Sequence, residues 1–408
     1  MRRKKSKFLL AVTVLLLPVG FWVNEPTGTP ISKHAIDIPV NPHLQDFVEH
    51  LNDTLAWLAR ETPGAAVAFV RGDSIVYSNG FGVTKIGTTD SVSANTVFRI
   101  GSVSKGFASV LAGIVAQENK LSFQDDVRKF LPDFSLKTND TLRLVHLLSH
   151  TSGLPYQAYS TMIEDNEDRD VMIDQLSTLK LIGKPGEYYS YQNVGYSIIE
   201  PVIEKIEKMK FDSALQERIF KPLNMSTASA NRYGMINRND IAYPHFGSSK
   251  HWRKGNISHH YYNTAAAGGV NASANDMGQW LKALLGHRPD VVSKSTLDSL
   301  YAPRVRTYIK YKQFARWKHV SKTYYGMGWR IVPHEKDTVI YHGGYVNGYS
   351  SRIALVPKED IGICILSNSP SSFASKSVPI FLHLYDRYKD KINNWVPEHL
   401  PTTMEAGL

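Results

Sequence analysis

Residues 98–107 read FRIGSVSKGF and place a serine, Ser102, three positions before a lysine, Lys105. The stretch runs directly into an apolar repeat with the spacing of one helix face, formed by Phe107, Val110, Leu111, Ile114 and Val115. A helix beginning here would hold Ser102 at its start and Lys105 one turn later on the same side.

This pairing has a chemical consequence. A serine hydroxyl is a weak nucleophile until a neighbouring base takes its proton, and a lysine amine can be that base if burial or a nearby cation lowers its pKa. The free N–H groups of a helix start also favour a developing oxyanion. A capping serine beside a solvated lysine would give the same pattern, and the pattern recurs at Ser177 and Lys180, so the pair alone does not decide the function.

Size and charge narrow the classes of protein. The chain has 408 residues, of which 42% are hydrophobic, enough for one large domain or two moderate ones. The net charge is +10, but five of the positive charges lie within residues 1–7, and the remainder of about +5 does not indicate nucleic-acid binding. The single cysteine, Cys364, excludes an intrachain disulfide.

The N-terminus has the pattern of an export signal. Residues 1–7 are basic and residues 8–23 carry no charge. We expect residues 1–26 to be a signal peptide or an uncleaved membrane anchor, with anchoring through residues 8–23, and residues 27–42, which contain several prolines, to be a linker. The rest would then be exported to the periplasm or the cell envelope.

Strand patterns lie at both ends of the chain around a mostly helical middle. A helix is expected from Leu44 to Leu58 and a β-hairpin over residues 65–79. Later strands are expected at 325–332, 338–341, 349–356 and 361–366, the last covered on both faces, and helices at 194–206, 276–285 and 372–389. The pattern predicts an α/β (α+β) fold with one main domain over 43–392, in which helices flank an antiparallel sheet from both chain ends (43–118 and 322–392) and a helical domain is inserted (119–321); a tail follows (393–408).

Several further segments resemble the serine β-lactamase and penicillin-binding-protein superfamily, in its class C (AmpC-like) branch. The Ser-x-x-Lys element is a known feature of that superfamily. The other segments that carry the resemblance are Pro63–Val67, His146–Pro155, Pro185–Asn193, Lys221–Met225, Ala267–Val270 and His342–Gly344. Single motifs are common by chance, since Tyr-x-Asn occurs four times, but their order over residues 43 to 390 is specific.

The resemblance implies a role for each matching residue. Ser102 would become acylated, and Lys105 and Tyr191 would transfer protons. A tyrosine needs a neighbouring cation to act as a base at neutral pH, and Lys105 could be that cation. Asn193 would hold Lys105 and contact a substrate amide.

His342, Gly343 and Gly344 would form the β-edge on which an extended substrate lies. The N–H of Tyr345 would pair with that of Ser102 as an oxyanion hole. The class C branch carries lysine where this chain has His342, and histidine is mostly neutral at pH 7. This departure puts efficient β-lactam turnover in doubt. Family members with histidine there include D-amino-acid peptidases, and related members are esterases.

The sequence therefore predicts an exported serine hydrolase that acts through an acyl-Ser102 intermediate on β-lactams, D-amino-acid peptides or esters. The alternative is a membrane-anchored penicillin-binding sensor that is acylated without turnover. Glu164, in an acidic cluster, is better explained as part of an exposed loop than as a deacylating base. No cofactor, metal or nucleic acid is expected, and the partner would be a small-molecule or short peptide substrate.

Overall fold

The computed structural model describes residues 41–248, 251–308, 314, 317, 320–334 and 337–396. The described residues belong to one compact unit that begins at Asn41. The predicted signal or anchor, most of the linker and most of the tail lie outside the described residues, so export and anchoring stay predictions. Within the described ranges, none of the helices is both long and apolar enough to cross a bilayer.

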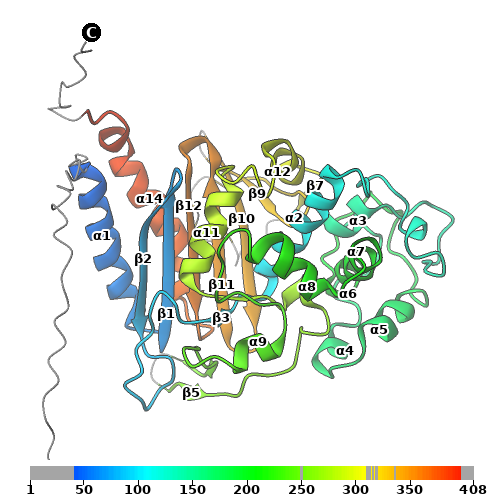
Figure 1. The fold of residues 1–408 in the computed structure, drawn as a ribbon, viewed down its shortest axis with the longest axis horizontal. Helices are drawn as coiled ribbons and strands as arrows, with labels where there is room; N and C mark the ends of the chain where they lie inside the picture. Colours follow the sequence, from blue (N-terminus) through cyan, green and yellow to red (C-terminus); the bar gives the residue numbers. More distant parts are fainter. Residues whose placement is uncertain are drawn as a thin grey trace, which may run out of the picture. The chain divides into compact units, whose positions relative to one another are not determined.

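An eight-stranded antiparallel sheet with the order β2-β1-β12-β11-β10-β9-β8-β7 forms the centre of this unit (Figure 1). Its strands are β1 (Gly64–Arg71), β2 (Ser74–Gly82), β7 (Val305–Thr307), β8 (Thr323–Tyr325), β9 (Arg330–His334), β10 (Asp337–Val346), β11 (Tyr349–Val356) and β12 (Ile361–Ser367). Short pairs are β3 (Phe98–Arg99) with β6 (Asn271–Ala272) and β4 (His245–Phe246) with β5 (Arg253–Lys254). Because β1 from the N-terminal part pairs with β12 from the C-terminal part, the predicted sheet from both chain ends is confirmed.

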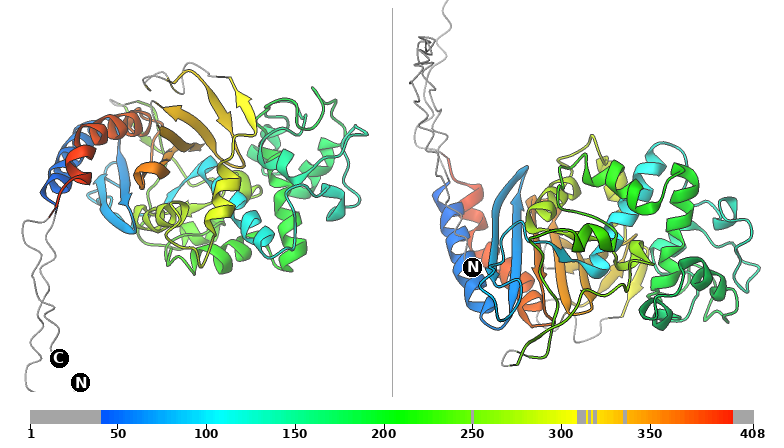
Figure 2. Two further views of the ribbon diagram at one scale, coloured as in Figure 1. Left: turned by 90° about the horizontal axis from the view of Figure 1, so that it is seen from above. Right: turned by 60° about the horizontal axis from the view of Figure 1, so that its bottom comes forward.

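Helices surround this sheet: some pack on its two faces, and those of the middle region lie to one side of it (Figure 1). The helices are α1 (Pro42–Ala59), α2 (Ser104–Gln117), α3 (Leu144–Leu148), α4 (Ser160–Glu164), α5 (Arg169–Leu176), α6 (Asn193–Ser197), α7 (Ile199–Glu207), α8 (Phe211–Leu215), α9 (Arg232–Ile236), α10 (Ala265–Gly268), α11 (Ala274–Leu284), α12 (Lys294–Tyr301) and α14 (Phe373–Asn393). Three-residue 3₁₀ turns span Gly101–Val103, Val127–Lys129 and Pro357–Glu359, and a π-helical turn spans Gln216–Phe220. Figure 2 shows α1 and α14 side by side on the outer face, and they contact each other directly.

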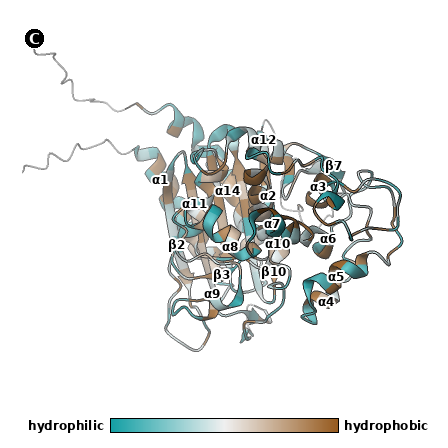
Figure 3. Ribbon diagram, turned by 45° about the vertical axis from the view of Figure 1, so that its right-hand side comes forward, coloured by the Kyte–Doolittle hydropathy of each residue, from teal (hydrophilic) through white to brown (hydrophobic). Residues whose placement is uncertain are grey.

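Alternation along the central strands divides the apolar residues between two cores. In β1, Ala66 and Ala68 face the inner core, which contains α2, while Val67 and Phe69 face the outer core under α1 and α14. Every residue of β12 is buried, as a strand covered on both faces should be. Figure 3 shows apolar residues concentrated in these strands and in α2. On the inner face α11 packs against β1, β2 and β12, and the 3₁₀ turn that leads into α2 contacts β10 and β11.

Three elements differ from the sequence prediction. The strand expected at 325–332 is two strands, β8 and β9, because a tight turn closed by the Gly326 N–H and the Trp329 carbonyl (2.8 Å) separates them. The helix expected at 194–206 divides into α6 and α7, where Ser197 Oγ donates to the Asn193 carbonyl (3.2 Å), a contact that bends helices. Strand β7, from the segment predicted as the helical insert, joins the edge of the sheet.

We predict that the inner core depends on the contact between α2 and α11. Trp280 is fully buried, and its ring stacks on that of Phe107 at a centroid distance of 4.0 Å. Trp280→Ala should lower the free energy of unfolding by about 3–5 kcal/mol. Trp57→Ala, at a tryptophan that is 62% exposed, should change it by no more than about 0.5 kcal/mol. Chemical denaturation measures both values, and equal losses would contradict the assignment of Trp280 to the core.

Candidate active site

Ser102 lies in the 3₁₀ turn Gly101–Val103, directly before α2. The helix therefore begins two residues later than the sequence predicts, but the turn leads straight into it. Gly101 has φ +52°, in the left-handed region that glycine adopts easily. The Ile100 N–H bonds to the Val270 carbonyl (3.1 Å), which holds the chain just before Ser102 against the segment after α10. Ser102 remains partly exposed while its neighbours are buried.

Lys105 is fully buried, and its Nζ has three oxygen partners. Nζ lies 3.5 Å from Ser102 Oγ, 2.7 Å from Asn193 Oδ1 and 2.9 Å from the Ala267 carbonyl. The structure therefore brings the Ser102 hydroxyl and the Lys105 amine next to the amide of Asn193, although Asn193 lies 91 residues after Ser102 in the sequence. Two firm acceptors hold the amine, and its contact with Ser102 is the longest of the three.

The electrostatic surroundings favour a neutral amine. Burial lowers the pKa of Lys105 well below its ordinary value because the ammonium form loses its hydration, and the positive charge of Arg330 lowers this pKa further. A neutral lysine can accept the proton of Ser102.

Tyr191 lies beside the same amine. Lys105 Nζ is 4.7 Å from the centre of its ring, and the ring of His150 packs against it at 4.2 Å. Burial raises the pKa of Tyr191, and a hydrogen bond with Ser102 opposes this only in part. The phenol therefore keeps its proton at neutral pH. Tyr191 is thus suited to donate a proton. Lys105 is suited to accept one, and it does not act as the cation that would ionise Tyr191.

The side-chain amide of Asn193 is occupied within the protein. Its Oδ1 accepts from Lys105, and its Nδ2 donates to Gln157 Oε1 (2.8 Å) and to Tyr261 Oη (3.4 Å). Asn193 thus holds Lys105 as the resemblance implies. The amide N–H that was expected to meet a substrate faces Gln157 instead.

His342 is buried, with 1% of its surface exposed. Its Nδ1 lies 3.0 Å from the Gly343 carbonyl, and its Nε2 lies 3.0 Å from Tyr325 Oη. Because a carbonyl only accepts, we assign the proton to Nδ1, which leaves Nε2 to accept from Tyr325. Burial, together with the charges of Arg330 and Lys105, lowers the pKa of His342 well below its ordinary value. The His342 ring is therefore uncharged where it lines the site.

Strand β10 offers an open edge next to Ser102. It pairs with β11 as far as Val346, but β9 pairs with it only as far as Tyr341, so the edge from His342 to Val346 is not covered by β9. A Cβ added at Gly344 would come within 2.0 Å of the Ile100 carbonyl oxygen, and one added at Gly101 within 2.9 Å of the backbone of Tyr345. These two glycines let the backbone amide of Tyr345 lie against the turn that carries Ser102.

A model described as beta-lactamase matches residues 44–384 of this sequence. The chain belongs to the β-lactamase family. It is 26% identical over 336 residues to Protein flp of Staphylococcus aureus (strain N315), covering 78% of this chain and 61% of that protein. It is 22% identical over 370 residues to unguisins hydrolase ungD' of Aspergillus campestris, covering 86% of this chain and 66% of that protein. The chain thus spans less than two thirds of the length of either relative.

Among solved structures, the octameric penicillin-binding protein homologue from Pyrococcus abyssi is similar to this chain with a TM-score of 0.71 at 22% identity. The similarity covers 83% of this chain and 76% of that chain and shows a shared fold. The match to the family model confirms the superfamily predicted from the sequence, and members of this family are generally hydrolases. The class C branch stays a prediction.

Packing adds residues to this β-lactamase-family site that the sequence did not reveal. The Arg330 guanidinium lies 5.8 Å from the ring centre of Tyr191 and 5.6 Å from that of Tyr325. Gln157 fixes Asn193, as described above. Nothing in the sequence around Arg330 marks it, because its role depends on where β9 begins beside β10. The Ala267 carbonyl lies in a segment that the resemblance singled out, but a backbone acceptor has no sequence signal.

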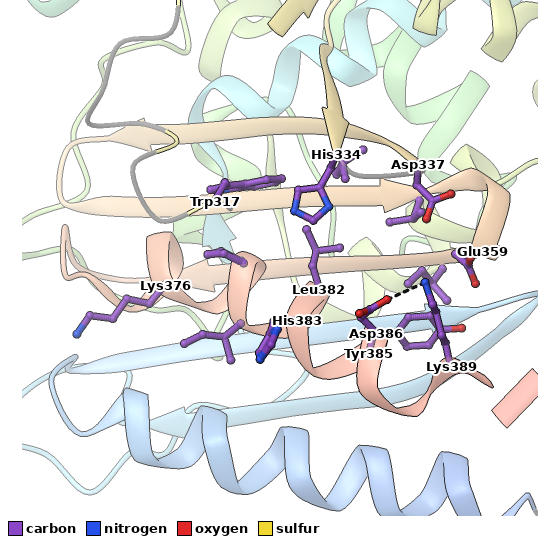
Figure 4. A pocket seen from close by; sticks show the side chains of 15 residues that line it. Trp317, His334, Asp337, Glu359, Lys376, Leu382, His383, Tyr385, Asp386 and Lys389 are labelled. Carbon is purple, nitrogen blue, oxygen red and sulfur yellow. Dashed lines mark ion pairs between the residues drawn. The ribbon is translucent and has the colours of Figure 1, made fainter. Parts of the chain in front are cut away.

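A cavity of about 260 Å³ lies on the other side of the sheet (Figure 4). Trp317, His334 and residues of α14 line it, and the Asp386–Lys389 ion pair (2.7 Å) stands at one end. None of the predicted site residues lines this cavity. The predicted site residues of this β-lactamase-family chain are gathered around Ser102, away from this cavity.

We predict that acylation of Ser102 requires neutral Lys105 and so rises with pH through the pKa of this amine. Arg330→Gln should raise that pKa, because it removes a positive charge that disfavours the ammonium form. The acid limb of the acylation rate against pH should therefore move to higher pH. Arg128→Gln removes an arginine that forms an exposed ion pair with Asp126 and whose charge is not among those that lower the pKa of Lys105, and it should leave the limb in place. If the acid limb shifted equally in the two variants, the assignment of Lys105 as a base whose pKa is lowered by Arg330 would be contradicted.

Proposed function

We propose that this chain is a serine hydrolase of the class C-like branch that works through an acyl-Ser102 intermediate. The observation that carries the proposal is a fully buried lysine amine 3.5 Å from the hydroxyl of a partly exposed serine. Burial and Arg330 lower the pKa of that amine, so it can be neutral when a substrate arrives. A lysine that served only the fold would not need to lie against a serine beside an open strand edge.

In this proposal Lys105 accepts the proton of Ser102 as Oγ attacks the acyl carbon. The oxyanion forms near the backbone N–H groups of Ser102 and Tyr345. The Tyr191 phenol, hydrogen-bonded to Ser102, donates a proton to the leaving nitrogen or oxygen and takes one back from Lys105. Water then hydrolyses the ester on Ser102.

The uncharged ring of His342 supports the proposal that the substrates are peptides and esters, as the resemblance implied. A β-lactam carboxylate would meet no lysine there, and Arg330 is the permanent cation beside Tyr191 and Tyr325. D-amino-acid peptides and esters are therefore proposed ahead of β-lactams. A relative named as a hydrolase supports turnover over stoichiometric acylation.

A fluorophosphonate probe should label the wild-type protein, and Ser102→Ala should abolish the labelling, because Ser102 is the serine whose hydroxyl lies 3.5 Å from Lys105 Nζ. Ser177→Ala is the matched control, since Ser177 begins the second Ser-x-x-Lys pattern and is partly exposed at the end of α5. This variant should be labelled like the wild type. In-gel fluorescence measures both, and labelling that survives Ser102→Ala would place the nucleophile elsewhere.

We further predict turnover rather than permanent acylation. Mixing the protein with a p-nitrophenyl ester should give a burst of about one equivalent of product and then a steady rate, as acylation and deacylation follow each other. A D-Ala-D-Ala peptide and nitrocefin, assayed in parallel, rank the three substrate classes. A burst without a steady rate on all three would favour the acylated sensor instead.

A further inference from the structure

Glu200 is a buried carboxylate outside the machinery described so far. It lies on α7 and is 3% exposed. Its Oε1 accepts a hydrogen bond from the backbone N–H of Ala266 (2.8 Å), and its Oε2 lies 3.4 Å from Arg169 Nη1. A buried carboxylate is costly unless such partners hold it, so its position is tightly determined.

The bond to Ala266 reaches the first turn of α10, a helix of four residues. Helix starts leave N–H groups that need outside acceptors, and the usual acceptor is the N-cap side chain. Here the N-cap residue, Thr264, makes no such bond, and its buried Oγ1 has no partner among the described residues. Glu200 therefore caps α10 from a different helix.

The next residue of α10 holds the catalytic amine. The carbonyl of Ala267 accepts from Lys105 Nζ at 2.9 Å, shorter than the 3.5 Å from Nζ to Ser102 Oγ. Glu200 and Lys105 thus bind the backbones of two consecutive residues, Ala266 and Ala267, of one short helix. A displacement of this helix would move the oxygen that aims the amine.

We propose that Glu200 is a positioning residue for catalysis: by capping α10 it fixes the Ala267 carbonyl, which orients Lys105 toward Ser102. This inference rests on the proposed function, because it assigns Lys105 the role of base.

The ion pair with Arg169 does not explain why a carboxylate is buried at position 200. Arg169 already binds both oxygens of Glu204, at 3.0 and 2.8 Å, and also Asp170 at 3.0 Å. Its contact with Glu200 is the longest that it makes. Burial raises the pKa of Glu200 to about 7, while Arg169 and the Ala266 N–H oppose the rise. A carboxyl group can accept from Ala266 in either protonation state, so the cap does not depend on the charge.

The test compares variants of the full chain by the rate at which a p-nitrophenyl ester acylates Ser102, measured from the burst of p-nitrophenolate. Glu200→Ala removes the cap and should slow acylation on the order of tenfold or more, as small misplacements of catalytic groups do. Glu200→Gln keeps an oxygen acceptor and should stay within about threefold of the wild type. Glu204→Ala removes the other carboxylate on Arg169, one turn along the same helix, and should acylate at the wild-type rate.

If Glu200→Ala does not fold, Glu200→Asp replaces it. This change keeps the charge but withdraws the carboxylate by about 1.5 Å, roughly one carbon–carbon bond, and should slow acylation in the same way. Equal rates for the wild type and the variant that loses the cap would overturn the proposal. So would equal slowing by the Glu200 and Glu204 variants, because that would indicate general loosening.

A second measurement separates this proposal from the proposed function. The ¹³Cε resonance of Lys105, assigned by comparison with Lys105→Arg, reports the titration of the amine without any substrate. Loss of the Ala267 acceptor removes a contact that favours the ammonium form, so the pKa of Lys105 should fall in Glu200→Ala and not in Glu200→Gln. An unmoved titration would contradict the positioning role. A wild type that no probe acylates would contradict the proposed function alone.

Discussion

The burial of one lysine amine is the constraint around which this molecule is arranged. Lys105 Nζ has no exposed surface, so the protein must supply acceptors where water would otherwise be. It does so with Asn193, from the start of α6, and with the Ala267 carbonyl, from α10. Three segments far apart in the chain are thus fixed around one nitrogen. The third contact of the Lys105 amine is with the Ser102 hydroxyl, and the proposed proton transfer depends on this contact.

Close backbone packing supplies the second half of the site. Gly344 and Gly101 allow β10 and the turn before α2 to approach until their main chains touch. Ser351 Oγ also donates to the Ile100 carbonyl at 2.6 Å and ties β11 to the same turn. Pairing with β11 keeps the part of β10 beside Ser102 extended, while β9 leaves its other edge uncovered from His342 to Val346. Such an edge suits an extended substrate that binds through its main chain.

The surroundings move the pKa values of the two neighbouring groups in opposite directions. Burial lowers the pKa of Lys105 and raises that of Tyr191, so both groups are driven toward their uncharged forms. An uncharged amine can take a proton, and an uncharged phenol can give one. His342 is likewise driven neutral by burial and by Arg330. Arg330 lies outside the sequence motifs, and its permanent positive charge lowers the pKa values of Lys105 and His342.

The sequence by itself determined much of this protein. Apolar alternation and helical spacing identified the strands at both chain ends and α2, because burial on one or two faces leaves a periodic record. The order of short motifs identified the superfamily and brought Ser102, Lys105, Tyr191 and Asn193 forward as one set. Only the tertiary structure decided what surrounds that set. The pairing of His342 with Tyr325, the use of the Asn193 amide by Gln157, the charge of Arg330 and the cap from Glu200 all depend on contacts between distant segments. Such contacts follow from packing in three dimensions and leave no period or spacing along the chain.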